Sequence, residues 1–114
     1  MALNIIYLII KHKIKMYKIT EYTKARAKEL NVIVKPSTYK NKKIDVYKDG
    51  IKIASIGGIK PDGTPYMDYP NYIKKDGLEI ANIKRLNYLK RHSKEVKEKD
   101  GVKTPSYWAD KLLW

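Results

Sequence analysis

Apolar and polar residues alternate along residues 44–48 and 51–56, on either side of the dipeptide Asp49-Gly50. Successive side chains of a strand point to opposite faces of a sheet, and Asp-Gly between two such runs is typical of a two-residue type I′ hairpin turn. The pattern predicts a hairpin that pairs Lys48 with Ile51 and, continuing in step, Ile44 with Ser55. In this register the buried face consists of Ile44, Val46, Ile51 and Ile53, and Ala54 points to the other face.

Shorter signals flank this hairpin. Thr20 is a suitable N-cap, and we expect a helix from Glu21 to Leu30 that stops at Asn31. The β-branched run 32–34 predicts a short strand that ends near Pro36. Residues 59–73 contain prolines and a glycine, which exclude a long regular element and favour a surface connector.

A second, longer helical pattern covers residues 77–98. Asp76 to Glu79 has the spacing of a capping box, in which an acidic cap and a glutamate at the third helical position satisfy the first free N–H groups. Lysine and arginine crowd the last turns, where cations complement the helix dipole. Asp100-Gly101 is expected to end this helix.

The two sides of this long helix differ in character. Apolar residues recur at helical spacing on one side, which we expect to face the core. Cations and a tyrosine recur on another side, which predicts an exposed basic stripe. The expected buried residues are Ile80, Ile83, Leu86 and Leu89; the expected stripe is Lys84, Tyr88 and Arg91, with Arg85 and His92 beside it.

Thr104-Pro105 resembles an N-cap followed by proline at the first helical position, so residues 106–114 are expected to form a short terminal helix. Together these elements predict one α+β domain over residues 16–114. Its small antiparallel sheet is built around the Asp49-Gly50 hairpin and is packed with one long basic helix and two short helices.

Residues 1–15 are set apart as an N-terminal extension. Their apolar run, Ala2 to Ile10, is too short to span a bilayer and lacks the basic start and cleavage site of a signal peptide. Three interpretations remain: a strand or helix packed on the domain, a membrane-surface anchor at Ile5 to Ile10, or an upstream extension of the coding region. Met16 precedes the first clear structural signal and favours the third.

The net charge of the chain says more about its function than about its fold. The 114 residues contain 25 Lys and Arg against 12 Asp and Glu, for a formal net charge of +13, which favours an anionic partner. There is no cysteine and only two histidines, so thiolate chemistry and Cys- or His-rich metal sites are excluded. No phosphate-cradling glycine loop or paired catalytic group is recognisable. We therefore expect a binding protein that is not an enzyme and that needs no cofactor or metal.

Two basic clusters contain aromatic rings and are the candidate nucleic-acid sites. One precedes the hairpin and the other follows the basic stripe of the long helix. Such clusters attract phosphates by counterion release, and a neighbouring tyrosine can stack on a base. Simple solvation of a lysine-rich surface is the competing explanation. The candidate residues are Lys40, Lys42, Lys43, Lys84, Arg85 and Arg91, with Tyr88 as the stacking residue.

The C-terminal aromatic residues allow two interpretations. They either close the core against the long helix or anchor a partner protein, because Trp and Tyr are frequent hot-spot residues at interfaces. The candidate partner-binding residues are Tyr107, Trp108, Leu112 and Trp114.

Three blocks of the chain are similar to a known group of sequences. They are Lys35 to Thr38 with Lys42-Lys43 and the hairpin end, the connector Tyr66 to Ile73, and Arg85, Tyr88 and Arg91-His92 followed by Pro105 and Trp108 to Trp114. They resemble a family of small basic proteins of large DNA viruses, relatives of mimivirus and phycodnavirus. The C-terminal block ends in aromatic-Ala-Asp-Lys-Leu-Leu-Trp.

The resemblance implies a viral context but no catalytic residues. It places the protein in the virion or in the viral factory of the host cytoplasm. The leading hypothesis is non-enzymatic binding of nucleic acid, DNA rather than RNA, through phosphate contacts with little sequence specificity. The alternative is a minor capsid or other structural protein that binds acidic capsid proteins and docks by its C-terminal aromatic helix. A membrane partner is the least favoured.

Overall fold

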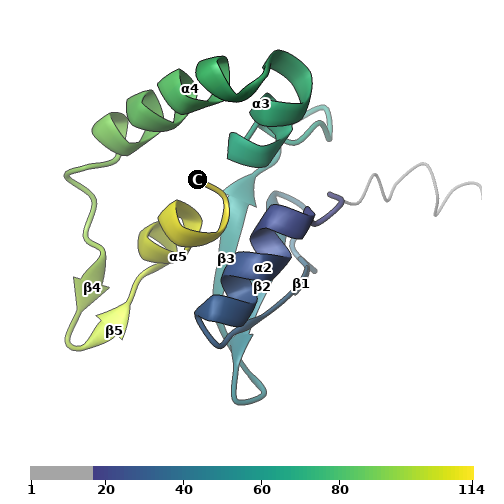
Figure 1. Ribbon diagram of the computed structural model, residues 1–114. Helices are drawn as coiled ribbons and strands as arrows, with labels where there is room; N and C mark the ends of the chain where they lie inside the picture. The colour runs from purple at the N-terminus through teal and green to yellow at the C-terminus, as the bar shows by residue number, and fades with distance from the viewer. Residues whose placement is uncertain (1–16) are drawn as a thin grey trace, which may run out of the picture.

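The computed structural model describes residues 17–114 and confirms the expected α+β class (Figure 1). A three-stranded antiparallel sheet has the order β1-β2-β3, and four helices and a two-stranded sheet surround it in the described range. The proposed extension, residues 1–15, lies outside the described residues. No helix between residues 17 and 114 is long and apolar enough to cross a bilayer. The elements are α2 (Glu21–Glu29), β1 (Ile33–Pro36), β2 (Lys42–Lys48), β3 (Ile51–Gly58), α3 (Tyr69–Asp76), α4 (Leu78–Arg91), β4 (Glu98–Lys99), β5 (Val102–Lys103) and α5 (Pro105–Leu112).

The turn between β2 and β3 is confirmed, but the expected buried face is partly wrong. Asp49 and Gly50 have φ of 51° and 77°, the positive values that a type I′ turn requires. Lys48 pairs with Ile51 as expected, yet a bulge beside Val46 shifts the register so that Val46 pairs with Ala54. One extra residue in β3 reverses which side chains face the core beyond the bulge. The buried residues are therefore Ile44, Val46, Ala54 and Ile56, while Ile51 is 67% exposed and Ile53 is half-buried.

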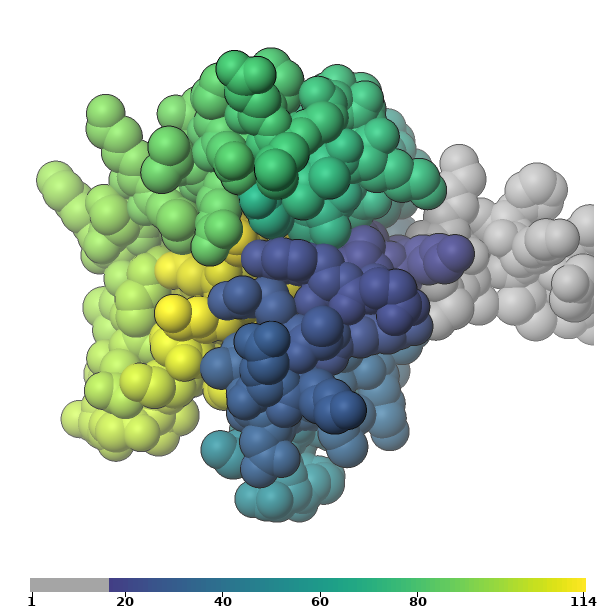
Figure 2. All heavy atoms as spheres, in the orientation of Figure 1, coloured from purple at the N-terminus to yellow at the C-terminus, as the bar shows by residue number. Residues whose placement is uncertain are grey.

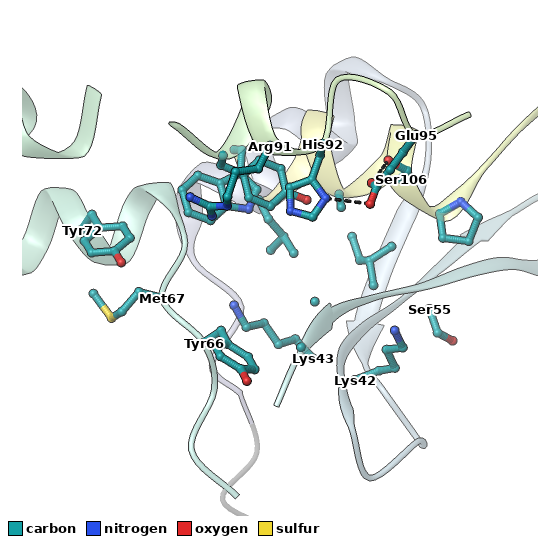
Figure 3. A pocket seen from close by; sticks show the side chains of 18 residues that line it. Lys42, Lys43, Ser55, Tyr66, Met67, Tyr72, Arg91, His92, Glu95 and Ser106 are labelled. Carbon is teal, nitrogen blue, oxygen red and sulfur yellow. Dashed lines mark hydrogen bonds and ion pairs between the residues drawn. The ribbon is translucent and has the colours of Figure 1, made fainter. Parts of the chain in front are cut away.

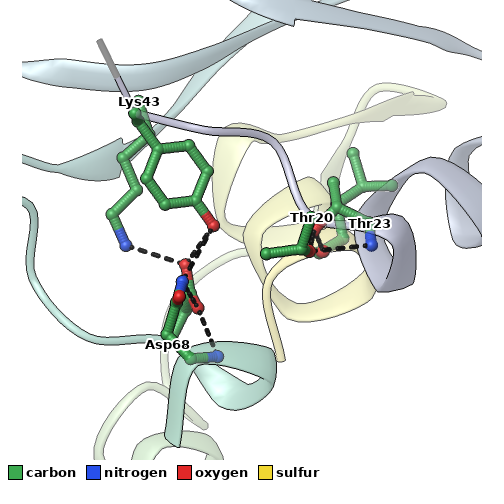
Figure 4. A network of polar contacts seen from close by, with 7 residues as sticks. Thr20, Thr23, Lys43 and Asp68 are labelled. Carbon is green, nitrogen blue, oxygen red and sulfur yellow. Dashed lines mark hydrogen bonds and ion pairs between the residues drawn. The ribbon is translucent and has the colours of Figure 1, made fainter. Parts of the chain in front are cut away.

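Helices α2 and α5 pack together against the sheet and enclose the C-terminal end of the chain. Thr20 caps α2 as expected, and Thr23, one turn on, donates a 2.7 Å hydrogen bond to the carbonyl oxygen of Leu112 (Figure 4). Tyr22 donates to the carbonyl of Trp114 at 3.2 Å. The carbonyl of Leu112, the last residue of α5, has no partner within the helix, and Thr23 satisfies it. In Figure 2 the yellow C-terminal segment lies between the blue atoms of α2, the green helices above it and the yellow-green segment beside it.

Helix α3 occupies part of the segment expected to be a connector. Asp68 is its N-cap and accepts hydrogen bonds from the backbone N–H and the side-chain amide of Asn71, at 3.3 and 2.7 Å. Pro70 lies in the first turn, where a missing N–H is tolerated. Proline here helps to start a helix instead of excluding one, so the expectation of a connector was wrong over residues 69–73.

The boundaries of the long helix also differ from expectation. Asp76 is the last residue of α3, and α4 begins after Gly77, which has φ of 88° and provides no side-chain cap, so the capping box is wrong. Helix α4 ends at Arg91, not near residue 98. Asp100-Gly101 instead forms the turn between β4 and β5, with φ of 53° and 78°.

The faces of α4 differ in part from the prediction. Ile80, Ile83 and Leu86 are 41%, 51% and 68% exposed, so most of the expected core side faces solvent, and only Leu89 of that set is half-buried. Of the expected basic side, Arg85 and Tyr88 are half-buried against the aromatic residues of α3 and the C-terminus, whereas Lys84 and Arg91 are exposed. Lys84 lies 5.6 Å above the Tyr72 ring, Arg85 lies 5.1 Å above the Tyr69 ring, and Tyr88 stacks on Trp114 at 4.2 Å. Cation–π contacts and ring stacking allow this basic face to pack on an aromatic surface.

A fully buried carboxylate, Asp45, lies on the face of β2 opposite the core. Its oxygens accept 2.6 Å hydrogen bonds from the hydroxyls of Ser37 and Ser55 and a 3.2 Å bond from the N–H of Thr38, and Lys52 lies 3.8 Å away. Burial acts to raise the pKa of Asp45, but these hydrogen bonds and the lysine outweigh it and hold the pKa below its ordinary value of 3.8. The network ties the loop before β2 to β3.

Asp45 therefore contributes an acid-sensitive part of the stability. Because its pKa is lower in the folded state, this contribution is complete above 3.8 and is lost as the pH falls through the folded-state pKa. We expect the free energy of unfolding of Asp45→Asn, measured by urea denaturation, to vary less than that of the wild type across this acidic range. Parallel pH dependences of the two proteins would contradict the assignment.

Candidate ligand-binding pocket

A pocket of about 660 Å³ opens between the start of β2, the end of β3, the end of α4 and the start of α5 (Figure 3). Its volume lies within the range of small-molecule sites, roughly 300–1,000 Å³. The residues that line it come from positions 42 to 114, so the fold and not a local motif assembles it. Those used below are Lys42, Lys43, Tyr66, Tyr72, Tyr88, Arg91, His92, Glu95, Ser106 and Trp114.

Cationic side chains approach the pocket from two sides. Arg91 and His92, at the end of α4, form one wall, and Lys42 and Lys43, at the start of β2, lie opposite (Figure 3). Lys42 is half-buried and Arg91 is exposed, and neither forms an ion pair with another described residue. Their charges are thus available to an anionic ligand.

Aromatic rings form a column beside these cations. The ring of Tyr88 stacks on Trp114 on one side and on His92 on the other, with centroid distances of 4.2 Å in both cases. Burial, followed by the nearby charges of Asp110 and Glu95, raises the pKa of Tyr88 to about 12, so its hydroxyl stays protonated near neutral pH. Tyr66 is 54% exposed and lines the pocket from the connector after β3. Its exposed ring is within reach of a planar group, with the Lys60 ammonium 5.5 Å from the ring centroid.

A polar network holds the segment after α4 against α5. Ser106, in the first turn of α5, donates a 2.7 Å hydrogen bond to Glu95, and His92 Nδ1 lies 2.8 Å from the other Glu95 oxygen. These bonds, from Ser106 first, lower the pKa of Glu95. Lys97 donates to Ser106 and pairs with Asp110 at 2.8 Å. The network fixes His92 and satisfies the carboxylate of Glu95, the acidic side chain of the pocket lining.

The predicted site residue Lys43 forms a buried ion pair. Its ammonium lies 3.1 Å from Asp68, and the two side chains are 2% and 0% exposed (Figure 4). Burial lowers the pKa of Lys43, against the opposing effect of Asp68. Tyr17 also donates a hydrogen bond to Asp68, and burial together with the Asp68 charge raises the pKa of this phenol. Lys43 lines the pocket with its aliphatic chain, which lies against Gly57, where a Cβ would come within 2.6 Å of Lys43 Cδ.

The structure brings together part of the predicted nucleic-acid set. Lys42, Lys43, Tyr88 and Arg91 line the pocket, although they belong to two clusters far apart in sequence. The other three candidates do not line it: Lys40 is exposed in the loop before β2, and Lys84 and Arg85 lie over the rings of Tyr72 and Tyr69. Tyr88 is held between Trp114 and His92, so it orders the wall and does not present a free stacking face.

The predicted partner-binding residues mostly belong to the core. Trp108, Leu112 and Trp114 are 6%, 0% and 7% exposed, and only Tyr107 is half-buried. Core closure, one of the two interpretations of this segment, agrees with their burial. They offer no exposed aromatic face to a partner, because α2, the sheet and α4 already cover them.

His92, Tyr66 and Tyr72 were missing from the predicted site. The two tyrosines occur in a proline-rich segment, and no periodic pattern distinguishes them. The sequence places His92 beside the exposed basic stripe. Glu95 and Ser106, which connect His92 to α5 by hydrogen bonds, become its neighbours only after folding. In residues 17–114 no three His, Cys, Asp or Glu side chains converge on a possible metal site. Comparisons with protein-family models, curated proteins and solved structures find no match to this chain.

Proposed function

We propose that this protein binds single-stranded nucleic acid without catalysing a reaction, and that one nucleotide enters the pocket between β2, α4 and α5. The observation that carries the proposal is the convergence of Lys42 and Arg91, both without ion-pair partners, at a pocket of about 660 Å³. Phosphates would lie against these two cations. The remaining positive charge of the chain attracts the rest of the strand.

The choice of a single strand rests on the aromatic lining. A base in a duplex is stacked on its neighbours and cannot enter a pocket without being flipped out, whereas an unpaired base is free to do so. Tyr66 presents an exposed ring beside the pocket, and Tyr72 lies in its lining. Stacking on tyrosine does not distinguish one base from another, which is consistent with low sequence specificity. The preference for DNA over RNA remains an expectation from the viral resemblance.

A salt titration tests the proposal. We expect an unstructured DNA oligonucleotide to bind more tightly than a duplex of equal length in fluorescence anisotropy, with an affinity that falls steeply as salt increases. For single strands the logarithmic slope changes by about 0.7 per phosphate contact, so Lys42→Ala with Arg91→Ala should reduce the slope by about 1.4 and weaken binding roughly tenfold at low salt.

The matched control removes the same charge elsewhere. Lys28 and Lys48 are exposed and do not line the pocket. Replacing both with alanine should change affinity much less than the Lys42 and Arg91 substitutions. Equal losses in the two double variants would locate the binding in the general charge of the chain and not in the pocket. No binding at low salt would refute the proposal altogether.

The capsid alternative lacks a comparable observation. Its proposed docking residues, Trp108, Leu112 and Trp114, are buried. Viral origin and location in the virion or viral factory likewise remain proposals. Identification of the protein in purified virions by mass spectrometry would test them directly.

A further inference from the structure

Helix α4 presents an unpartnered apolar stripe on the side away from the domain. Glu79, Ile83, Leu86 and Lys90 follow one another at intervals of four, three and four residues, which is the spacing of a coiled-coil seam. All four are exposed, and Ile80, 41% exposed, borders the stripe. The inner face of α4 is occupied by the aromatic contacts described above. Ile83 and Leu86, bordered by Ile80 and flanked by charged residues, form an exposed apolar patch, and an apolar patch with a polar rim is typical of an interaction surface.

The order of residues in the stripe is self-complementary. Helix α4 has 14 residues, from Leu78 to Arg91, and its midpoint falls between Lys84 and Arg85. Ile83 and Leu86 are equidistant from this midpoint, and so are Glu79 and Lys90. If a second α4 lies antiparallel across the first, Ile83 therefore meets Leu86 of the other copy, and Glu79 meets Lys90.

The end residues of the stripe have opposite charges and no partner in their own chain. Neither Glu79 nor Lys90 forms an ion pair with another described residue. In an antiparallel pair of helices, Glu79 of each copy lies opposite Lys90 of the other, so two ion pairs form. A two-fold interface requires such a self-complementary surface, and a partner of another kind would not.

We propose that two copies of this chain associate through an antiparallel pairing of their α4 helices, with Ile83 and Leu86 at the two-fold axis and Glu79 paired with Lys90 of the second copy. The proposal is independent of the nucleic-acid function, because Lys42 and the pocket lie on the other side of α4. A helix of 14 residues is about 21 Å long, so this contact is smaller than a standard interface of about 1,200–2,000 Å². The dimer is therefore reversible and depends on concentration.

Salt should affect this association in the opposite direction from nucleic-acid binding. Each copy carries a net charge of +13, which opposes association at low ionic strength. At physiological salt, charges farther apart than about 8 Å are largely screened, and the apolar contact is retained. We expect dimerisation to strengthen from low to physiological salt.

The test is sedimentation equilibrium of the full chain with a charge swap. Glu79→Lys or Lys90→Glu alone places two like-charged pairs in the dimer and should raise its dissociation constant about tenfold. The double variant E79K/K90E exchanges the charges and should restore wild-type association. Leu86→Lys should weaken the dimer about a hundredfold, since the apolar contact is lost twice. Because Leu86 is 68% exposed, the melting temperature of the Leu86→Lys variant in dilute solution should equal that of the wild type.

Three results would overturn the proposal. The first is a wild-type protein that remains monomeric at every concentration, and the second is a double variant no more dimeric than either single one. The third is a lower melting temperature of Leu86→Lys at unchanged molecular mass. That outcome would mean that the stripe is covered by a segment of the same chain, for which the apolar residues 3–10 are the candidate.

Discussion

Asp68→Asn is expected to lower the free energy of unfolding by about 3–5 kcal/mol, because it leaves the ammonium of Lys43 buried without its counter-ion. The two side chains are 0% and 2% exposed and lie 3.1 Å apart, so water cannot replace the lost carboxylate without opening the fold. Asp68 also caps α3 and accepts the hydroxyl of Tyr17. Asparagine keeps a side-chain oxygen that can cap α3 and accept a hydroxyl, so the expected loss comes chiefly from the unpaired charge. Urea denaturation followed by circular dichroism measures the change.

A double variant separates the unpaired charge from the other roles of Asp68. Replacing a buried ion pair with uncharged groups is often close to neutral, whereas breaking it from one side is not. Lys43→Met combined with Asp68→Asn should therefore be more stable than Asp68→Asn alone. If the double variant were the less stable of the two, the unpaired charge of Lys43 would not account for the effect of Asp68→Asn.

Leu112→Ala should destabilise the protein by about 2–5 kcal/mol, the range for truncation of a buried leucine with a cavity left behind. Leu112 is 0% exposed at the centre of the contact between α2, α5 and the sheet, and its carbonyl accepts the hydroxyl of Thr23. Thermal and urea unfolding provide the measurement. The matched control is Leu78→Ala at the start of α4, where 57% exposure predicts a change within about 0.5 kcal/mol.

The residues that follow Leu112 are also part of the core. Leu112, Leu113 and Trp114 are all buried, so their deletion removes part of the core and the stacking partner of Tyr88. A truncated chain is expected to unfold, and loss of any activity in it would report on folding. A truncated protein with wild-type stability would revive the interpretation that these residues anchor a partner.

Much of the local structure could be predicted because its causes lie within a few residues. Thr20 and Thr104 cap α2 and α5 by accepting N–H groups three residues ahead. Asp49-Gly50 forms a hairpin turn because both residues adopt positive φ. The same dipeptide at 100–101 forms a second hairpin, and the error there was to treat it as a helix stop. Asp-Gly is compatible with both a hairpin turn and the end of a helix, and the sequence around residues 100–101 does not distinguish the two.

The candidate site was predictable only in part, because its two halves meet through the fold. Basic clusters containing Lys42 and Arg91 were recognisable from composition. Their approach to one pocket depends on α5 and the C-terminal Trp114, against which Tyr88 stacks. The burial of Lys43 depends on Asp68, 25 residues away, and an isolated sequence window treats that lysine like any other surface cation.

The sequence by itself determined the α+β class, the turn at Asp49-Gly50, the caps of α2 and α5 and the strong positive charge. Each of these follows from short-range hydrogen bonding, backbone preference or simple counting. Tertiary structure alone decided the bulge that turns Ala54 and Ile56 inward, and which side of α4 faces the domain. Hydrophobic patterning assumes that the apolar side of a helix is buried. Here Arg85 and Tyr88 pack on the rings of Tyr69 and Trp114 instead, and Ile83 and Leu86 stay exposed.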